Sequence, residues 1–105
     1  MILEHAVLEV KPDLVGSFLE AIQEAKLVML ANEGCRSLRV LRSMETPNRF
    51  VLLVEWDSVD AHQVGFRGTP AYEQWRALLH HHYEPMPIVE HYTTVVDESP
   101  QRYQA

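Results

Sequence analysis

The chain is poor in cysteine and in basic residues, and it has no long apolar run. A single cysteine, Cys35, excludes an internal disulfide. No apolar stretch approaches the roughly 20 residues that a membrane-spanning helix requires. Met1 leads directly into an alternating pattern, without the basic segment and apolar stretch of a signal peptide. We therefore expect a cytoplasmic protein that does not enter a membrane.

The charge balance excludes two further classes of partner. The 15 acidic residues outnumber the 9 basic ones, the formal net charge is -6, and the acidic residues are spread along the chain. This distribution disfavours binding to nucleic acid or to an anionic membrane. The expected partner is a small molecule or another protein. A length of 105 residues suits one domain, which we place at residues 1–96, followed by a polar, mobile tail at residues 97–105.

Hydrophobic periodicity predicts the secondary structure. Alternating residues indicate four strands, at residues 2–10, 35–44, 49–56 and 88–96. Helical spacing predicts a helix with one apolar face between Pro12 and Asn32. A second helical region runs from about residue 58 to 82 and is interrupted before Pro70. Ser58 and Thr69 are expected to cap its two pieces.

The order of these elements is β-α-β-β-α-β, which predicts an α+β, ferredoxin-like fold. In that arrangement the first and third strands are the central ones of a four-stranded antiparallel sheet. Both of these strands carry apolar residues on their two faces. Two helices can cover only one face, and each apolar Å² left in water forgoes about 25 cal/mol. We therefore predict a homodimer that forms sheet to sheet.

Aromatic residues gather around the interrupted helix. It lies between Trp56 and Trp75, the two tryptophans of the chain, and it carries His62, Phe66 and Tyr72. Such a stripe suits either a hydrophobic core or the wall of a pocket. The periodicity alone leaves both interpretations open.

Several short runs resemble the antibiotic biosynthesis monooxygenase family: V-E-W-D-S at 54–58, A-H at 61–62, F-R at 66–67, P-A-Y at 70–72 and P-I-V-E-H-Y at 87–92. The resemblance spans roughly residues 2–96. It implies a dimeric α+β barrel in which each subunit holds a small pocket between its helices and its sheet. Members of the family include oxygenases that act on aromatic polyketides or quinols without metal or flavin, haem-degrading enzymes, and proteins with no established reaction.

The two enzymatic branches differ in their pocket residues. The haem-degrading branch has an asparagine, a tryptophan and an iron-binding histidine, which align here with His5, Phe66 and Arg76; none of the three matches. The polyketide-oxidising branch has an asparagine, a tryptophan and a tyrosine. These fall on His62, Phe66 and Tyr72, so the tyrosine alone is retained.

A cofactor-free oxygenase needs a dry pocket, a proton acceptor and a hydrogen-bond donor, because a deprotonated phenol gives an electron to dioxygen readily. His62 is the candidate base and Tyr72 the candidate donor. The candidate substrate-binding residues are Phe66, Trp75, His5, His91 and Trp56. We expect a monooxygenase that uses a small phenolic, quinol or polyketide-type substrate and dioxygen, with no cofactor.

Other readings of the same residues remain open. The pocket could bind a small ligand without turnover, and haem binding is a third hypothesis. No metal is expected, because His5, His62 and His91 lack the spacing of a recognised ligand motif. The run His80-His81-His82 is expected to face solvent at a helix C-terminus. His91 and Tyr92 should point to opposite faces of the last strand.

Overall fold

A four-stranded antiparallel sheet forms one layer of the protein. The computed structural model describes residues 1–101. The strands are β1 (Ile2–Glu9), β2 (Cys35–Arg42), β3 (Arg49–Trp56) and β4 (Val89–Tyr92), and their order in the sheet is β2-β3-β1-β4. The predicted ferredoxin-like topology, with the first and third strands at the centre, is confirmed.

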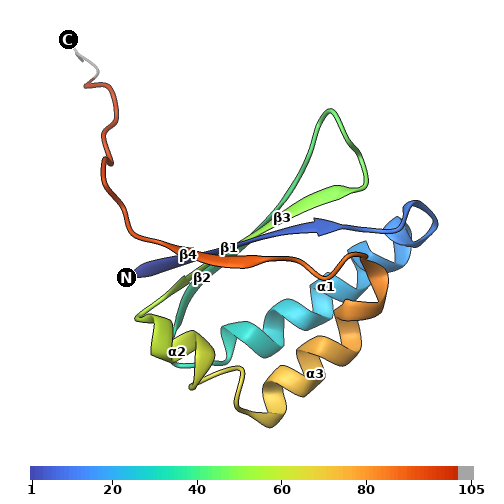
Figure 1. The fold of residues 1–105 in the computed structure, drawn as a ribbon, viewed down its shortest axis with the longest axis horizontal. Helices are drawn as coiled ribbons and strands as arrows, with labels where there is room; N and C mark the ends of the chain where they lie inside the picture. The colour runs from blue at the N-terminus through green and yellow to red at the C-terminus, as the bar shows by residue number, and fades with distance from the viewer. Residues whose placement is uncertain (102–105) are drawn as a thin grey trace.

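The second layer consists of helices that lie on one side of the sheet (Figure 1). These are α1 (Val15–Leu30), α2 (Val59–Gln63) and α3 (Pro70–Leu79), with the short 3-10 helices η1 (Pro12–Leu14) and η2 (His80–His82). The longer pair, α1 and α3, pack against each other. No helix within residues 1–101 is long and apolar enough to cross a membrane.

The core lies between the two layers and follows from the period-2 alternation of the strands. Even-numbered residues of β1 and β3 face the helices and are buried, apart from the half-buried Ile2. Apolar residues of α1 and α3 pack against these strand residues. The largest fully buried side chains are Trp56, Phe18, Phe50, Phe66, Leu8, Met29, Leu79, Val10 and Val54.

The interruption of the second helical region is real, but one of its predicted caps is wrong. The Ser58 hydroxyl accepts a hydrogen bond from the backbone N–H of Ala61 at 3.0 Å, as expected of an N-cap. Thr69 occupies the N-cap position of α3 without capping it. Its hydroxyl instead donates to the Phe66 carbonyl oxygen at 2.6 Å. The α3 helix therefore begins with Pro70, whose fixed φ suits a first turn.

The last strand is shorter than predicted. It ends at Tyr92, which pairs with Leu3 at the beginning of β1. Thr93 falls opposite Ile2, the first residue of β1, and residues 94–96 extend past the start of that strand, so the alternating pattern there does not become sheet. Residues 97–101 contain no helix or strand. The remaining four residues of the predicted tail lie outside the described part of the chain.

The face of the sheet opposite the helices is partly apolar, and no element within residues 1–101 covers it. Directly opposed residues of antiparallel strands share a face, which places one set of apolar side chains together there: Leu3, Val7, Leu41, Val51, Leu53 and Tyr92. Leu41 and Tyr92 are exposed. The sheet-to-sheet homodimer stays a prediction.

Candidate functional site

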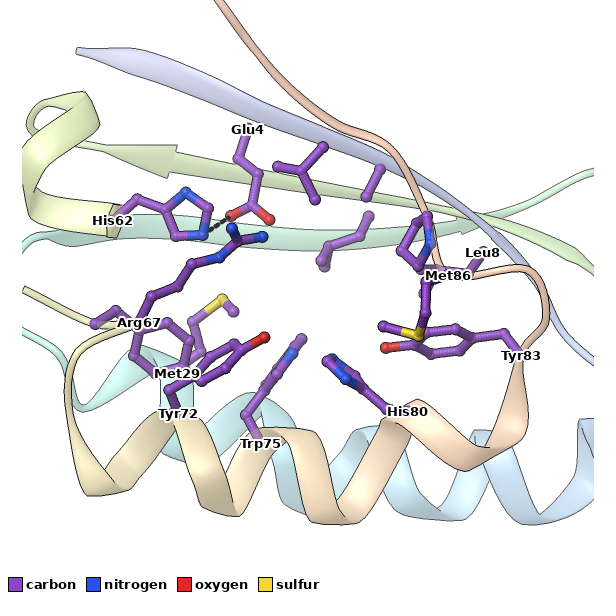
Figure 2. Close-up of a pocket in the computed structure, with 15 residues that line it drawn as sticks. Glu4, Leu8, Met29, His62, Arg67, Tyr72, Trp75, His80, Tyr83 and Met86 are labelled. Carbon is purple, nitrogen blue, oxygen red and sulfur yellow. Dashed lines mark ion pairs between the residues drawn. The ribbon is translucent and has the colours of Figure 1, made fainter. Parts of the chain in front are cut away.

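A cavity of about 70 Å³ lies between the sheet and the helical layer. Figure 2 shows the residues that line it: strand residues form the roof, and residues of α1, α3 and the segment after α3 form the floor and one end. Its lining comprises Glu4, Ala6, Leu8, Met29, Leu52, His62, Phe66, Arg67, Tyr72, Trp75, His80, Tyr83, Met86, Pro87 and Val89. Aromatic and aliphatic walls with a few polar groups are typical of small-ligand sites.

Glu4 is the acidic group of this cavity. It is only 3 % exposed, because it lies on the helix-facing side of β1. Its Oε1 accepts a hydrogen bond from Trp56 Nε1 at 2.8 Å. Its Oε2 accepts no hydrogen bond from residues 1–101 and points into the cavity (Figure 2). Burial raises the pKa of Glu4, and the hydrogen bond from Trp56 and the charge of Arg67 oppose that rise.

His62 lies beside Glu4 and is equally buried, at 2 % exposure. Its ring stacks on Trp56 with a centroid separation of 4.9 Å, and its Nε2 lies 3.3 Å from Glu4 Oε1. Burial lowers the pKa of His62 to about 4, and the positive charges of Arg67 and His91 act in the same direction. His62 is therefore a neutral imidazole at neutral pH, and its contact with Glu4 is a polar contact and not an ion pair.

A third side chain, His91, lies next to His62 on the side that faces solvent. Nδ1 of His62 lies 2.8 Å from Nε2 of His91, which is half-buried on β4. His91 is directly opposite Glu4 in the pairing of β4 with β1. Glu4, His62 and His91 thus form a continuous polar row from the cavity to the edge strand. Both ring nitrogens of His62 are engaged in it, and Glu4 Oε2 is the free acceptor.

Hydrogen-bonding groups also line the opposite side of the cavity. The hydroxyl groups of Tyr72 and Tyr83 and the ring of His80 point into it (Figure 2). Neither tyrosine hydroxyl has a hydrogen-bond partner among residues 1–101, although Tyr83 is only 5 % exposed. Both hydroxyls face the open space of the cavity, and no buried side-chain nitrogen or oxygen atom of residues 1–101 lacks a partner. The two hydroxyls are therefore free to hydrogen-bond to a polar molecule in the cavity.

Arg67 lies at the mouth of the cavity and is itself exposed. Its guanidinium lies 6.0 Å from the centre of the Tyr72 ring, within cation–π range. Figure 2 shows the same group extending toward Glu4. The cavity therefore has a carboxyl group inside and a movable positive charge at its entrance.

Helix α2 carries His62 and is held in place by close backbone packing. A Cβ atom at Gly34 would lie 2.7 Å from Ala61 Cβ, so only glycine allows α2 to approach the start of β2 this closely. Asn32 Nδ2 donates to the Gly65 carbonyl oxygen at 2.8 Å, just after the helix. Through these contacts the end of α1 fixes the position of the His62 ring.

The structure brings most of the sequence-predicted site residues to one place. His62, Phe66, Tyr72 and Trp75 line the cavity. Trp56 and His91 do not line it, but both contact groups that do: Trp56 donates to Glu4, and His91 contacts His62.

His5 lies elsewhere, because odd-numbered residues of β1 point away from the helices. Its ring packs edge-on against Tyr92, at a centroid distance of 5.6 Å, on the outer face of the sheet. The prediction that His91 and Tyr92 point to opposite faces is confirmed by the strand pairing.

Sequence reasoning missed three polar residues of the cavity: Glu4, His80 and Tyr83. Glu4 carried a usable signal, since a carboxylate among apolar residues on a strand face must find a partner. The expectation for the histidine run is wrong for two of its members. His82 is 3 % exposed, with Nδ1 3.1 Å from the Leu79 carbonyl oxygen, and His80 lines the cavity. The 3-10 turn after α3 rotates these rings inward, and His81 alone faces solvent.

The residues considered as metal or haem ligands are not arranged around one point. Within residues 1–101, no three His, Cys, Asp or Glu side chains are grouped as metal ligands. Glu4, His62 and His91 contact one another in a row and do not converge on one point. Arg76, which aligns with the haem-binding histidine, is exposed on α3 and lies 3.6 Å from Glu73.

Comparisons with known proteins agree with this fold. A family model described as antibiotic biosynthesis monooxygenase matches residues 1–78. The uncharacterized protein YczJ of Bacillus subtilis (strain 168) is 37 % identical over 95 residues, which cover 90 % of this chain and 100 % of YczJ. A solved structure from Bordetella bronchiseptica, provisionally named an antibiotic biosynthesis monooxygenase, has a TM-score of 0.85 and 32 % identity, covering 90 % of this chain and 97 % of its own.

A more distant structure shares the fold alone. A conserved protein from Methanosarcina mazei Go1 superposes with a TM-score of 0.76 at 23 % identity, over 87 % of this chain and 89 % of its own. The architecture is therefore kept where most of the sequence differs.

Proposed function

Because the chain belongs to the antibiotic biosynthesis monooxygenase family, we propose that it is a cofactor-independent monooxygenase that oxidises a phenol or quinol with dioxygen. The observation that carries this proposal is the free Oε2 of a buried carboxylate, Glu4, in the same cavity as the Tyr72 hydroxyl, with aromatic and aliphatic side chains making up most of the remaining wall. A proton acceptor and a hydrogen-bond donor in a dry site are the two groups that this chemistry requires.

In this mechanism Glu4 is the base, in place of His62, which the sequence suggested. Both nitrogens of the His62 ring are already engaged, by Glu4 and by His91. Burial raises the pKa of Glu4, and a carboxylate whose pKa lies closer to neutrality is a stronger base toward a phenol. His62 then serves to exchange protons with Glu4.

The reaction follows from these positions. Glu4 takes the proton of a substrate hydroxyl, and the phenolate gives one electron to dioxygen. Recombination of the resulting radical pair forms a carbon–oxygen bond and a peroxide, toward which the Tyr72 hydroxyl can donate a hydrogen bond. Loss of the proton on that carbon, together with departure of the distal oxygen as water, leaves a carbonyl group. One oxygen atom enters the product and the other leaves as water, so no external reductant is consumed.

The size of the cavity favours a single-ring substrate over a polycyclic one. Its volume of about 70 Å³ is smaller than the cavity of about 150 Å³ that accepts benzene in another protein. Some side chain must therefore move before any ring enters. Arg67 and Met86 are exposed residues at the wall and are flexible enough to do so. A single ring requires the smallest displacement.

Oxygen uptake tests this function. Methylhydroquinone, simple phenols and hydroxyanthrones are supplied in turn, with catalase present to correct for peroxide from autoxidation. We expect uptake above the protein-free rate, fastest with the single-ring quinol, and reduced at least about tenfold in Tyr72→Phe. Saturable binding of these compounds without uptake would contradict the proposal and identify a ligand-binding protein instead. A Soret band on titration with hemin would favour the haem-binding hypothesis.

We also propose that the functional form is a homodimer joined through the outer face of the sheet. The apolar side chains there, Val7, Val51 and Leu53 among them, lie on the two central strands. A groove beside them is lined in part by Pro85 and by Ile88, which is 82 % exposed. A second copy would cover the same patch on each subunit.

A further inference from the structure

We propose that His62 and His91 form a proton relay that connects Glu4 in the cavity to solvent at the edge of the sheet. This inference rests on the proposed function, since it concerns the proton that Glu4 accepts. It gives His91 a role different from substrate binding. His91 does not line the cavity, and it reaches the chemistry only through His62.

The geometry of the row supports transfer in both directions. Glu4 Oε1 lies 3.3 Å from His62 Nε2, and His62 Nδ1 lies 2.8 Å from His91 Nε2. Imidazole can accept a proton on one nitrogen while it releases another from the opposite nitrogen. The longer first contact is of a length that commonly tightens only when a reacting molecule is bound.

The proton balance closes at every step. At the start His62 is protonated on Nδ1. Glu4 takes the substrate proton on Oε2, and rotation of the carboxyl group by half a turn brings that proton next to His62. The proton then passes to His62 Nε2. His62 Nδ1 then gives its own proton to His91 Nε2, and His91 Nδ1 releases one to water. One proton enters the row and one leaves it, and the reverse sequence restores the starting tautomers.

The surroundings of His62 suit transient protonation. The ring is buried between the sheet and α2, stacked on Trp56, and a fixed positive charge in this position would be costly. The charged or titratable groups around it are Glu4 on β1, His91 on β4 and Arg67 after α2. Of these, His91 is the half-buried group on the edge strand that can discharge a proton to solvent.

Substitution of His91 separates a relay from a structural or binding role. His91→Gln retains a side chain that can hydrogen-bond to His62 Nδ1 but cannot pass a proton on. With methylhydroquinone and dioxygen, we expect kcat to fall about tenfold and KM to stay unchanged, with a larger solvent deuterium isotope effect on kcat. Free imidazole should restore part of the kcat of His91→Ala. His81→Gln, a change at an exposed histidine outside the row, is the matched control and should behave like the wild type.

The outcomes are distinct. A fully active His91→Gln protein with an unchanged isotope effect refutes the relay and leaves the oxygenase proposal standing. A rise in KM without a fall in kcat also refutes it, because His91 would then contact the substrate. If the wild type consumes no oxygen with any phenol or quinol, the proposed function fails and the relay fails with it. Nitrogen-15 NMR of the histidine rings requires no turnover, and the absence of a proton shared between His62 Nδ1 and His91 Nε2 would refute the relay without bearing on the proposed function.

Discussion

Nε2 of His62 lies 3.3 Å from Oε1 of Glu4, and both side chains are almost fully buried at the junction of β1 and α2. Burial acts on the two groups in opposite senses, raising the pKa of the carboxyl and lowering that of the imidazole. Each group is thereby moved toward its neutral form. Groups whose pKa values are shifted by burial and by a neighbouring titratable group cluster at functional sites.

Glu4→Gln should abolish most of the activity while the protein remains folded. The amide can still accept the hydrogen bond from Trp56 Nε1, but it cannot take a proton from a phenol. We expect kcat to fall about a hundredfold or more, with KM changed little. Oxygen uptake and thermal unfolding measure the two effects. Glu20→Gln, on the exposed side of α1, is the control, and equal activity of the two variants would contradict the assignment of Glu4.

The pH dependence of stability tests the state of His62. Its pKa is about 4 when folded and near 6.5 in an unfolded chain. Between these values the unfolded state binds more protons, so the contribution of His62 to stability is complete above about pH 6.5 and is lost as the pH falls toward 4. His80 and His82 act in the same direction, because burial lowers their pKa values as well. Glu4 acts in the opposite direction, because its pKa is raised.

A comparison of the wild type with His62→Gln isolates this contribution. The difference in unfolding free energy between the two proteins should change by roughly 3 kcal/mol between pH 7 and pH 4, in favour of the variant at low pH. Urea denaturation at several pH values gives this difference. A difference that stays constant over that range would show that the His62 pKa is the same in the folded and unfolded states.

Arg67 should set the acidic limb of the activity profile. Its positive charge opposes the rise in the Glu4 pKa, so Arg67→Ala should raise that pKa further. The acidic limb of log(kcat/KM) against pH then moves to higher pH. Arg76→Ala serves as the control, since Arg76 is exposed on α3 and does not line the cavity. A shift to lower pH, or equal shifts in both variants, would contradict the argument.

The outer face of the sheet should hold two copies together. We expect a dimer by analytical ultracentrifugation at micromolar protein concentration, and dissociation when Val51 and Leu53 are both changed to lysine, because the charges would be buried at the interface. Leu27→Lys alters an apolar residue of α1 that is 62 % exposed and should leave the dimer intact. A wild-type monomer at that concentration would refute the proposed assembly.

Local patterns in the sequence were sufficient for the fold. Period-2 alternation located the strands and their buried faces, and Pro70 and the Ser58 cap located the interrupted helix. The end of β4 was mispredicted because a strand needs a neighbour as well as a pattern. Where β1 begins is a property of the assembled sheet and not of residues 93–96.

The site was predictable only in part, for a related reason. Of the predicted site residues, His62, Phe66, Tyr72 and Trp75 line the cavity. The inward rotation of His80 and the approach of Tyr83 depend on how the chain returns from α3 to β4, which no local pattern encodes. The alternation showed that neighbouring strand residues face opposite sides of the sheet, but it did not show which side faces the helices, and His5 was placed on the wrong side. The partner that each residue meets, such as His91 for His62, required the three-dimensional structure.

The fate of dioxygen tests the central claim most directly. Methylhydroquinone is incubated with the protein under ¹⁸O₂, and the product and the water are analysed by mass spectrometry. We predict one ¹⁸O atom in each hydroxyquinone product and the other in water, with incorporation lost in Glu4→Gln. A quinone without ¹⁸O, formed together with labelled hydrogen peroxide, would mean that the protein only accelerates autoxidation. Incorporation that survives in Glu4→Gln would remove Glu4 from the mechanism.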